Sequence, residues 1–271
     1  MPSFNQISTA NLMRLIGTRD APEVIDVCIE PDFEDDPRLI PTARRCPHTD
    51  IEALIPELAG KRVVVICQKG KKLSHGAAAL LRAHGIQAEN LEGGNFGWRD
   101  AGLPLVPAAA MPQPLRGALW VTRHRPKIDR IACPWLIRRF VDPAAKFLFV
   151  PPADVELVAE KFGGTAFDIE GVAWSHHGDR CTFDTMIEAF KLDIPALQSL
   201  ATVVRAADTN RHDLAPEAAG LLAISVGLSR AYKDDIAQLD AGMEIYDALY
   251  RWARDGQGEG HDWPGNKKAG S

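Results

Sequence analysis

The chain has 271 residues, 46% hydrophobic and 25% charged, and carries a formal net charge of −5 at pH 7. No apolar run is long enough to cross a bilayer, and the first residues lack the basic start and apolar stretch of a secretory signal. The composition therefore excludes a membrane-spanning protein, and the negative charge disfavours nucleic-acid binding, which requires a basic face.

The first part of the chain alternates short β-rich runs with helical stretches, which is typical of a parallel sheet covered by helices. The run Val63–Ile66 is apolar without alternation, as expected for a central strand that is buried on both faces. We predict an α/β domain over residues 1–106, with strands at 23–27, 62–66 and 88–91 and helices at 9–16, 51–58 and 74–83.

The composition changes after this domain. Residues 107–117 are rich in proline and alanine and nearly uncharged, which indicates an interdomain linker. We predict a mainly helical α+β domain over 118–255 and a flexible tail over 256–271. Its predicted strands are 119–122 and 146–150, and its predicted helices are 129–141, 182–191, 195–207, 216–232 and 234–254.

The five cysteines lie at positions 28, 46, 67, 133 and 181, and none forms a Cys-x-x-Cys pair. An odd number of scattered cysteines does not describe a disulfide scaffold. It fits reduced thiols, so we expect a bacterial-type cytoplasmic protein.

Cys67 ends the buried strand and is followed by a loop rich in glycine and lysine. The carboxyl ends of parallel strands are where open α/β sheets bind ligands. Gly70 gives the backbone freedom to curl around the sulfur, and successive loop amides then form a nest for an anion. Together with the lysines, these donors favour the thiolate and would hold a persulfide on it. The anion-binding residues predicted on this basis are Gln68, Lys69, Gly70, Lys71 and Lys72.

Cys67 has a second interpretation, because a cysteine at the end of an apolar strand is often only a small buried residue. The loop that follows is poor core material, however, which favours the catalytic interpretation.

Several motifs occur in the order found in the rhodanese family, which the region from about residue 5 to 106 resembles. They are residues 23–27 (EVIDV), 39–43 (LIPTA), 67–74 (CQKGKKLS) and 91–94 (LEGG), followed by Trp98. The resemblance implies a sulfurtransferase in which Cys67 takes sulfane sulfur from a small-molecule donor and passes it to a thiol or another nucleophile. It also implies a structural role for Asp26.

The chain departs from the rhodanese pattern at two positions. Lys72 and Cys28 stand where many members have arginine, so bidentate anion recognition is lost at 72. Cys28 is interpreted either as a resolving thiol or as a packed bystander. The phosphatase relatives of the fold need arginine six residues after the cysteine, where this chain has Leu73, and this favours sulfur chemistry.

In the second half, residues 175–181 (SHHGDRC) bring two imidazoles, a carboxylate and a thiol together ahead of a predicted helix capped by Thr182. These groups are ligands for a transition metal. Asp208 and His212 would share one helix face if this segment is helical. Solvated histidines and helix caps are the alternative explanation.

Residues 119–252 resemble the C-terminal domain of the chromate resistance protein family of the ChrB type, carried by the segments 120–140, 147–152, 167–185, 203–232 and 246–252. Within this resemblance we expect His176 and Asp208 as metal ligands, with Cys181 or Asp184 next. Further candidates for the site are Asp129, Arg130, His177 and His212. The sequence does not choose between iron, manganese and zinc.

We therefore expect a sulfurtransferase whose C-terminal domain binds a divalent transition metal and serves resistance to chromate or oxidative stress. The alternative is a chromate- or metal-responsive regulator in which the rhodanese-like domain is vestigial or a redox switch.

Overall fold

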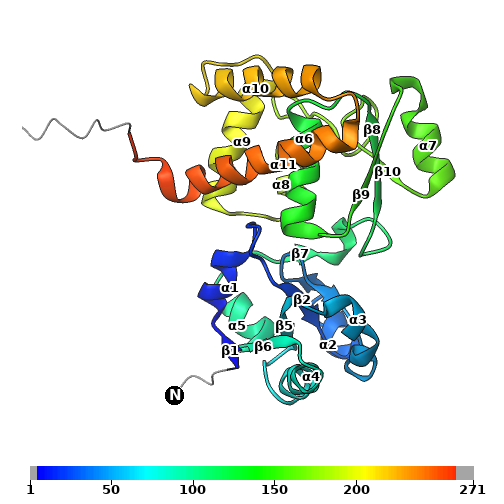
Figure 1. Ribbon diagram of the computed structural model, residues 1–271, viewed down its shortest axis with the longest axis vertical. Helices are drawn as coiled ribbons and strands as arrows, with labels where there is room; N and C mark the ends of the chain where they lie inside the picture. Colours follow the sequence, from blue (N-terminus) through cyan, green and yellow to red (C-terminus); the bar gives the residue numbers. More distant parts are fainter. Residues whose placement is uncertain (1–4, 261–271) are drawn as a thin grey trace, which may run out of the picture.

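The computed structural model describes residues 5–260 and contains two domains, coloured blue to cyan and green to red in Figure 1. A parallel sheet flanked by helices forms the N-terminal domain, and a mainly helical α+β unit forms the C-terminal one. Both predicted fold classes are confirmed. Residues 261–271 of the predicted tail lie outside the described residues.

The N-terminal sheet has five parallel strands in the order β1-β6-β5-β2-β4. The central strand β5 is buried at four of its five residues, as its unbroken apolar run predicts. The strands are β1 (Gln6–Ile7), β2 (Glu23–Asp26), β4 (Arg44–Arg45), β5 (Arg62–Ile66) and β6 (Gln87–Leu91).

Helices cover both faces of this sheet. The predicted helix 51–58 is instead a 3-10 helix, His48–Leu54, followed by α3 (Ile55–Leu58). Pro56 lies at the start of α3, and because proline has no N–H it cannot extend the preceding turn. The remaining helices are α1 (Thr9–Leu15), α2 (Glu30–Glu34), α4 (Lys72–Ala83) and α5 (Gly94–Asp100).

The C-terminal domain contains a three-stranded parallel sheet in the order β10-β8-β9. Its strands are β8 (Leu119–Arg123), β9 (Lys146–Val150) and β10 (Thr165–Ala166). Its helices are α6 (Asp129–Leu136), α7 (Val155–Phe162), α8 (Thr182–Ala189), α9 (Pro195–Asp208), α10 (Glu217–Ala231) and α11 (Asp235–Arg251). The sequence analysis missed α7 and β10. Residues 129–141 were predicted as a single α-helix, whereas α6 is followed by a π-helical turn over Ile137–Val141.

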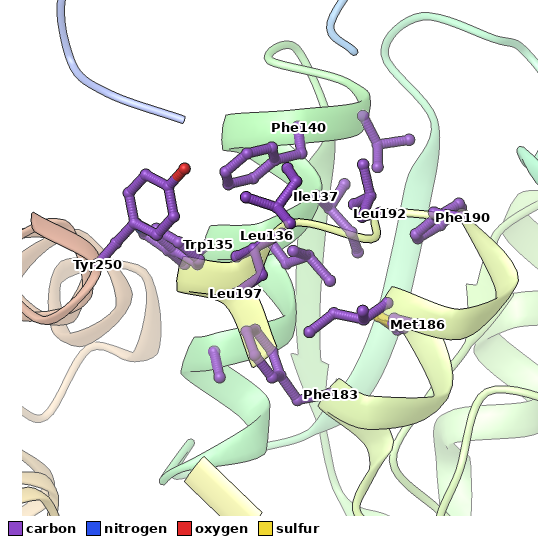
Figure 2. Packing of buried hydrophobic residues seen from close by; sticks show 14 of the residues in the cluster. Trp135, Leu136, Ile137, Phe140, Phe183, Met186, Phe190, Leu192, Leu197 and Tyr250 are labelled. Carbon is purple, nitrogen blue, oxygen red and sulfur yellow. The ribbon is translucent and has the colours of Figure 1, made fainter. Parts of the chain in front are cut away.

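Aromatic side chains fill the core of the C-terminal domain (Figure 2). The ring of Trp135 lies 5.7 Å from that of Phe140 and 5.5 Å from that of Tyr250. The indole Nε1 of Trp135 donates a hydrogen bond of 2.8 Å to Asp247, so this buried polar atom is satisfied. The rings therefore fix α6 and the π-turn against α11.

The apolar core is continuous across the two domains. Phe140 reaches the N-terminal domain at Gly17, where an added Cβ would lie 2.3 Å from the end of the phenyl ring. The amide of Thr42 donates a hydrogen bond of 3.1 Å to the carbonyl of Phe140. The domains thus meet through buried apolar packing, and Phe140 is at its centre.

The predicted linker, residues 107–117, contacts the rest of the protein at several points. Its first residue belongs to β7 (Val106–Pro107), which pairs antiparallel with β3 (Arg38–Leu39). Met111 is buried in the shared core, and Arg116 forms an ion pair with Glu23 at 3.1 Å. The connection is therefore held against the N-terminal domain.

None of the helices within residues 5–260 is long and apolar enough to cross a membrane.

Candidate functional site

Cys67 directly follows β5, at the carboxyl end of the N-terminal sheet. Its side chain is 5% exposed, and its thiol donates a hydrogen bond of 3.2 Å to the hydroxyl of Ser74 in the first turn of α4. The Ser74 hydroxyl in turn bonds to the carbonyl of Lys71 at 3.1 Å. Ser74 was not among the predicted site residues, although it closes the motif that carried the family resemblance.

Two glycines allow the cysteine loop to approach α5 closely. Gly70 and Gly94 have φ angles of +62° and +60°, which side chains disfavour. A Cβ on Gly94 would lie 2.1 Å from the carbonyl oxygen of Cys67 and 2.3 Å from the amide nitrogen of Gly70. Only glycine fits at this crossing.

The carbonyl groups of the loop are tied to the start of α5. The carbonyl of Cys67 accepts a hydrogen bond of 3.0 Å from the amide of Asn95, and the carbonyl of Gln68 accepts one of 3.0 Å from the amide of Phe96. In a trans peptide the N–H points opposite to the C=O. The amides of Gln68 and Lys69 therefore point away from α5 and are open to a ligand on the other side.

A cavity of about 510 Å³ opens beside Cys67. Gln68, Lys69, Lys71 and Lys72 line it, together with three residues that were not predicted: Ile29, Asp32 and Leu73. Ile29 and Asp32 come from the segment after β2, and no local pattern in the sequence connects them to the cysteine loop. The cavity combines lysine charge with an apolar wall.

Cys28 lies in the same buried cluster as Cys67. Burial, followed by the charge of Asp26, raises the pKa of its thiol well above the usual range. Asp26 accepts hydrogen bonds from the Cys28 amide at 2.9 Å and from the Asn95 side chain at 3.3 Å. Asp26 therefore joins the end of β2 to α5, which agrees with a structural role, and Cys28 is a protonated, packed neighbour of the site.

The C-terminal domain gathers a second cluster around His176. The Nε2 atom of His176 lies 3.1 Å from an oxygen of Asp208, 3.5 Å from one of Asp129 and 3.6 Å from one of Asp168. Asp129, His176 and Asp208 each offer a ligand atom within 4.8 Å of the others. The structure thus brings together His176, Asp208 and Asp129 of the predicted candidates.

Three separate elements supply these candidate ligand atoms. Asp129 is the first residue of α6 and Asp208 is the last residue of α9. His176 lies in the loop before α8, whose first amide, that of Thr182, donates a hydrogen bond of 2.6 Å to Asp129. Because the ligands are distant along the chain, only the packing of these elements assembles the cluster.

Asp168 is the member that the sequence analysis missed. It follows β10 with a φ angle of +55°, and its carboxylate pairs with Arg123 at 2.9 Å and with Arg130 at 3.3 Å. It also accepts a hydrogen bond of 2.9 Å from the Thr182 hydroxyl. Arg130, a predicted candidate, therefore reaches the site by neutralising Asp168.

The shared proximity of these groups shifts their pKa values. The hydrogen bond to Asp168 raises the pKa of His176 from 6.5 to about 9, reinforced by the charges of Asp129 and Asp208 and opposed by partial burial. Burial raises the pKa of Asp129 and of Asp208. Burial opposes ionisation of Asp168 too, but hydrogen bonds from His176 and Arg123 outweigh it and lower its pKa. The cluster therefore holds protons that a bound cation would displace.

The donor set fits a divalent transition metal. Asp129 is 1% exposed, and its Oδ1 atom has no hydrogen-bond partner among the described residues. A buried carboxylate oxygen is costly to leave unpaired. Two carboxylates and an imidazole suit iron, manganese or zinc. Beside His176 lies a cavity of about 530 Å³ that Arg123 and Asp168 also line.

Four predicted residues lie outside the ligand group. Cys181 is the N-terminal cap residue of α8, whereas Thr182 was predicted in this role. The backbone amide and the thiol of Cys181 contact the same oxygen of Asp184, at 3.1 and 3.4 Å. The other Asp184 oxygen pairs with Arg205 at 2.8 Å. Both side chains are thus engaged in capping α8.

The two remaining histidines are also apart from the ligands. His177 is exposed and its ring contacts the Ala173 carbonyl at 3.2 Å. The expected helical pairing of Asp208 with His212 is wrong, because α9 ends at Asp208 and Asn210 turns the chain with a φ angle of +58°.

Comparisons with known proteins match each domain separately. A family model for the rhodanese-like domain matches residues 8–101, and a model described as the ChrB C-terminal domain matches residues 120–253. Protein ChrB of Cupriavidus metallidurans is 36% identical over 140 residues, which is 51% of this chain. The match spans 42% of that relative's length.

Two solved structures with similarity to this chain each cover less than half of it. A rhodanese-related protein from Thermoplasma volcanium is 29% identical with a TM-score of 0.33, and the match covers 38% of this chain and 98% of that one. A thiosulfate sulfurtransferase from Pseudomonas aeruginosa is 26% identical with a TM-score of 0.32, covering 39% of this chain and 20% of that one. From the two family models, the chain consists of a rhodanese-like domain followed by a ChrB C-terminal domain.

Proposed function

We propose that the N-terminal domain is a sulfurtransferase that carries sulfur as a persulfide on Cys67. The observation that supports this most is the cavity beside the thiol, which is lined by Gln68 and by the lysines of the cysteine loop. An anionic sulfur compound is attracted by the lysines, and a persulfide anion is stabilised by the amides of Gln68 and Lys69.

The reaction has two displacements. The Cys67 thiolate attacks the sulfane sulfur of thiosulfate, a sulfur–sulfur bond to the cysteine forms, and sulfite leaves with the electron pair of the broken bond. A thiolate acceptor then attacks the outer sulfur and takes it away as its own persulfide, which restores the Cys67 thiolate. No oxidant or reductant is consumed.

Replacing Cys67 by serine is expected to abolish transfer of sulfur from thiosulfate, because a hydroxyl cannot take up the sulfur. Thiosulfate-treated wild type should gain the mass of a sulfur atom and the variant should not. Cys46→Ser is the matched control, since Cys46 is also buried but its thiol contacts the Pro47 carbonyl. Full activity in Cys67→Ser would refute the proposal. If wild type gained no sulfur from thiosulfate, the regulator alternative would be favoured. A salt-dependent mobility shift of the protein with DNA would support that alternative.

We also propose that Asp129, His176 and Asp208 hold a divalent transition metal in the C-terminal domain. The unpaired Asp129 oxygen supports this, together with the convergence of the three ligand atoms. Arg123 and Arg130 pair with Asp168 and hold its carboxylate beside the ligands, 3.6 Å from the same Nε2 atom of His176. A bound ion would supply Lewis acidity next to the cavity lined by Arg123.

Replacing His176 by alanine is expected to lower the metal content of the purified protein from about one ion per chain to a small fraction, since one of three ligands is lost. Elemental analysis and Mn²⁺ titration measure this. His177→Ala is the matched control, because His177 is the adjacent histidine and lies outside the ligand group. Equal metal content in all three proteins would remove His176 from the site.

Both sites together support a role in resistance to chromate or to oxidative stress, which we infer from the ChrB C-terminal domain that follows the rhodanese-like domain.

A further inference from the structure

The residue before Asp129 has an unusual backbone conformation. Ile128 has φ and ψ angles of 41° and −103°, which a β-branched side chain strongly disfavours. Strain of this kind persists only where the surrounding structure enforces it, and it gathers at functional sites. Because Ile128 directly precedes Asp129, the first residue of α6, the backbone conformation of Ile128 determines the position from which the Asp129 side chain extends.

Helix α11 enforces this conformation through one stripe of side chains four residues apart. The hydroxyl of Tyr246 donates a hydrogen bond of 3.1 Å to the carbonyl of Ile128, and the Gln238 amide donates one to the carbonyl of Pro126. Between them, Gly242 allows close contact: a Cβ there would lie 2.6 Å from Ile131 of α6. Gln238 and Tyr246 are both 1% exposed.

The same segment is held again at its start. The amide of Arg125 donates a hydrogen bond of 3.0 Å to Asp235 at the beginning of α11, and the Arg125 guanidinium donates one of 2.6 Å to the Ser229 carbonyl in α10. Residues 125–128 are thus clamped at both ends by α10 and α11. These contacts leave the chain little freedom where it enters Asp129.

We propose that Tyr246 and Gln238 are positioning residues for the metal site, acting through Ile128 to fix the Asp129 carboxylate. This inference rests on the proposed metal site. The Thr182 amide holds Oδ2 of Asp129 from α8, and the contacts from α11 hold the backbone just before it, so the carboxylate is restrained from two sides. A ligand placed in advance loses less freedom on binding, which raises the affinity for the ion.

Replacing Tyr246 by phenylalanine is expected to weaken Mn²⁺ binding about tenfold, the lower end of the cost of losing an outer contact, because Tyr246 contacts the residue before the ligand and not the ligand itself. Tyr250→Phe is the matched control, because Tyr250 is a buried tyrosine of the same helix whose ring packs against Trp135. Its affinity should stay within about twofold of wild type. Titration followed by electron paramagnetic resonance gives the affinity, and the spectrum of the bound ion reports its ligand geometry.

Urea unfolding of the metal-free variants separates positioning from stability. A purely structural role would lower the unfolding midpoint and leave the affinity and spectrum of the folded protein unchanged, which would overturn the inference. Gln238→Leu provides a second variant and is expected to weaken binding in the same direction. If wild type itself binds no Mn²⁺, Zn²⁺ or Fe²⁺, both the metal site and the inference fail; if wild type binds and both variants match it, only the inference fails.

Discussion

Replacing Phe140 by alanine is expected to destabilise the protein by about 3–5 kcal/mol, the usual cost of removing a buried phenyl ring. Phe140 is fully buried, its ring lies 5.4 Å from that of Tyr250, and it fills the space over Gly17 of the N-terminal domain. The cavity left by alanine would therefore lie between the domains. Urea unfolding should show a lower midpoint and a separation of the two domains into distinct transitions.

Phe162→Ala is the control for this experiment. Phe162 ends α7 and is 68% exposed, so its loss should change the unfolding free energy by less than about 0.5 kcal/mol. If Phe140→Ala were as stable as Phe162→Ala and still unfolded in one transition, the contact at Gly17 would not be what joins the domains.

Replacing Gly94 by alanine is expected to displace the cysteine loop and to reduce sulfur transfer by at least about tenfold, because misplacing reacting groups by about 1 Å costs up to a hundredfold. The new Cβ would meet the backbone of Cys67 and of Gly70, which is not a flexible side chain that could move away. The turnover of thiosulfate measures the effect, and circular dichroism checks that the sheet is intact.

Gly102→Ala is the control that distinguishes the steric clash expected in Gly94→Ala from the strain of placing alanine at a positive φ angle. Gly102 has a φ angle of +67°, close to that of Gly94, but an added Cβ meets nothing within 4 Å. Both variants bear strain of about 1–3 kcal/mol. Only Gly94→Ala should impair sulfur transfer, and equal activity in the two variants would contradict the close crossing of the loop and α5.

Features that depend on neighbours along the chain could be predicted from the amino-acid sequence. The strand Arg62–Ile66 was predicted with its observed bounds, since an unbroken apolar run of this length is typical of a strand buried on both faces. The position of Cys67 at the strand end, and the curl at Gly70, follow from the same short segment. Local hydrophobic patterns and turn residues carry this information because the forces they reflect act within a few residues.

Which polar residues lie together depends on how the helices pack, and the sequence pattern does not contain this information. Asp168 was not predicted as a site residue, yet it lies in the cluster beside His176. Cys181 and Asp184 are close to His176 in the sequence, but they cap α8 instead. A carboxylate near a helix start can cap that helix or face a neighbouring element, and the sequence pattern is the same in both cases. The choice depends on how α6, α8 and α9 pack, and burying the apolar faces of those helices is what brings Asp129, His176 and Asp208 together.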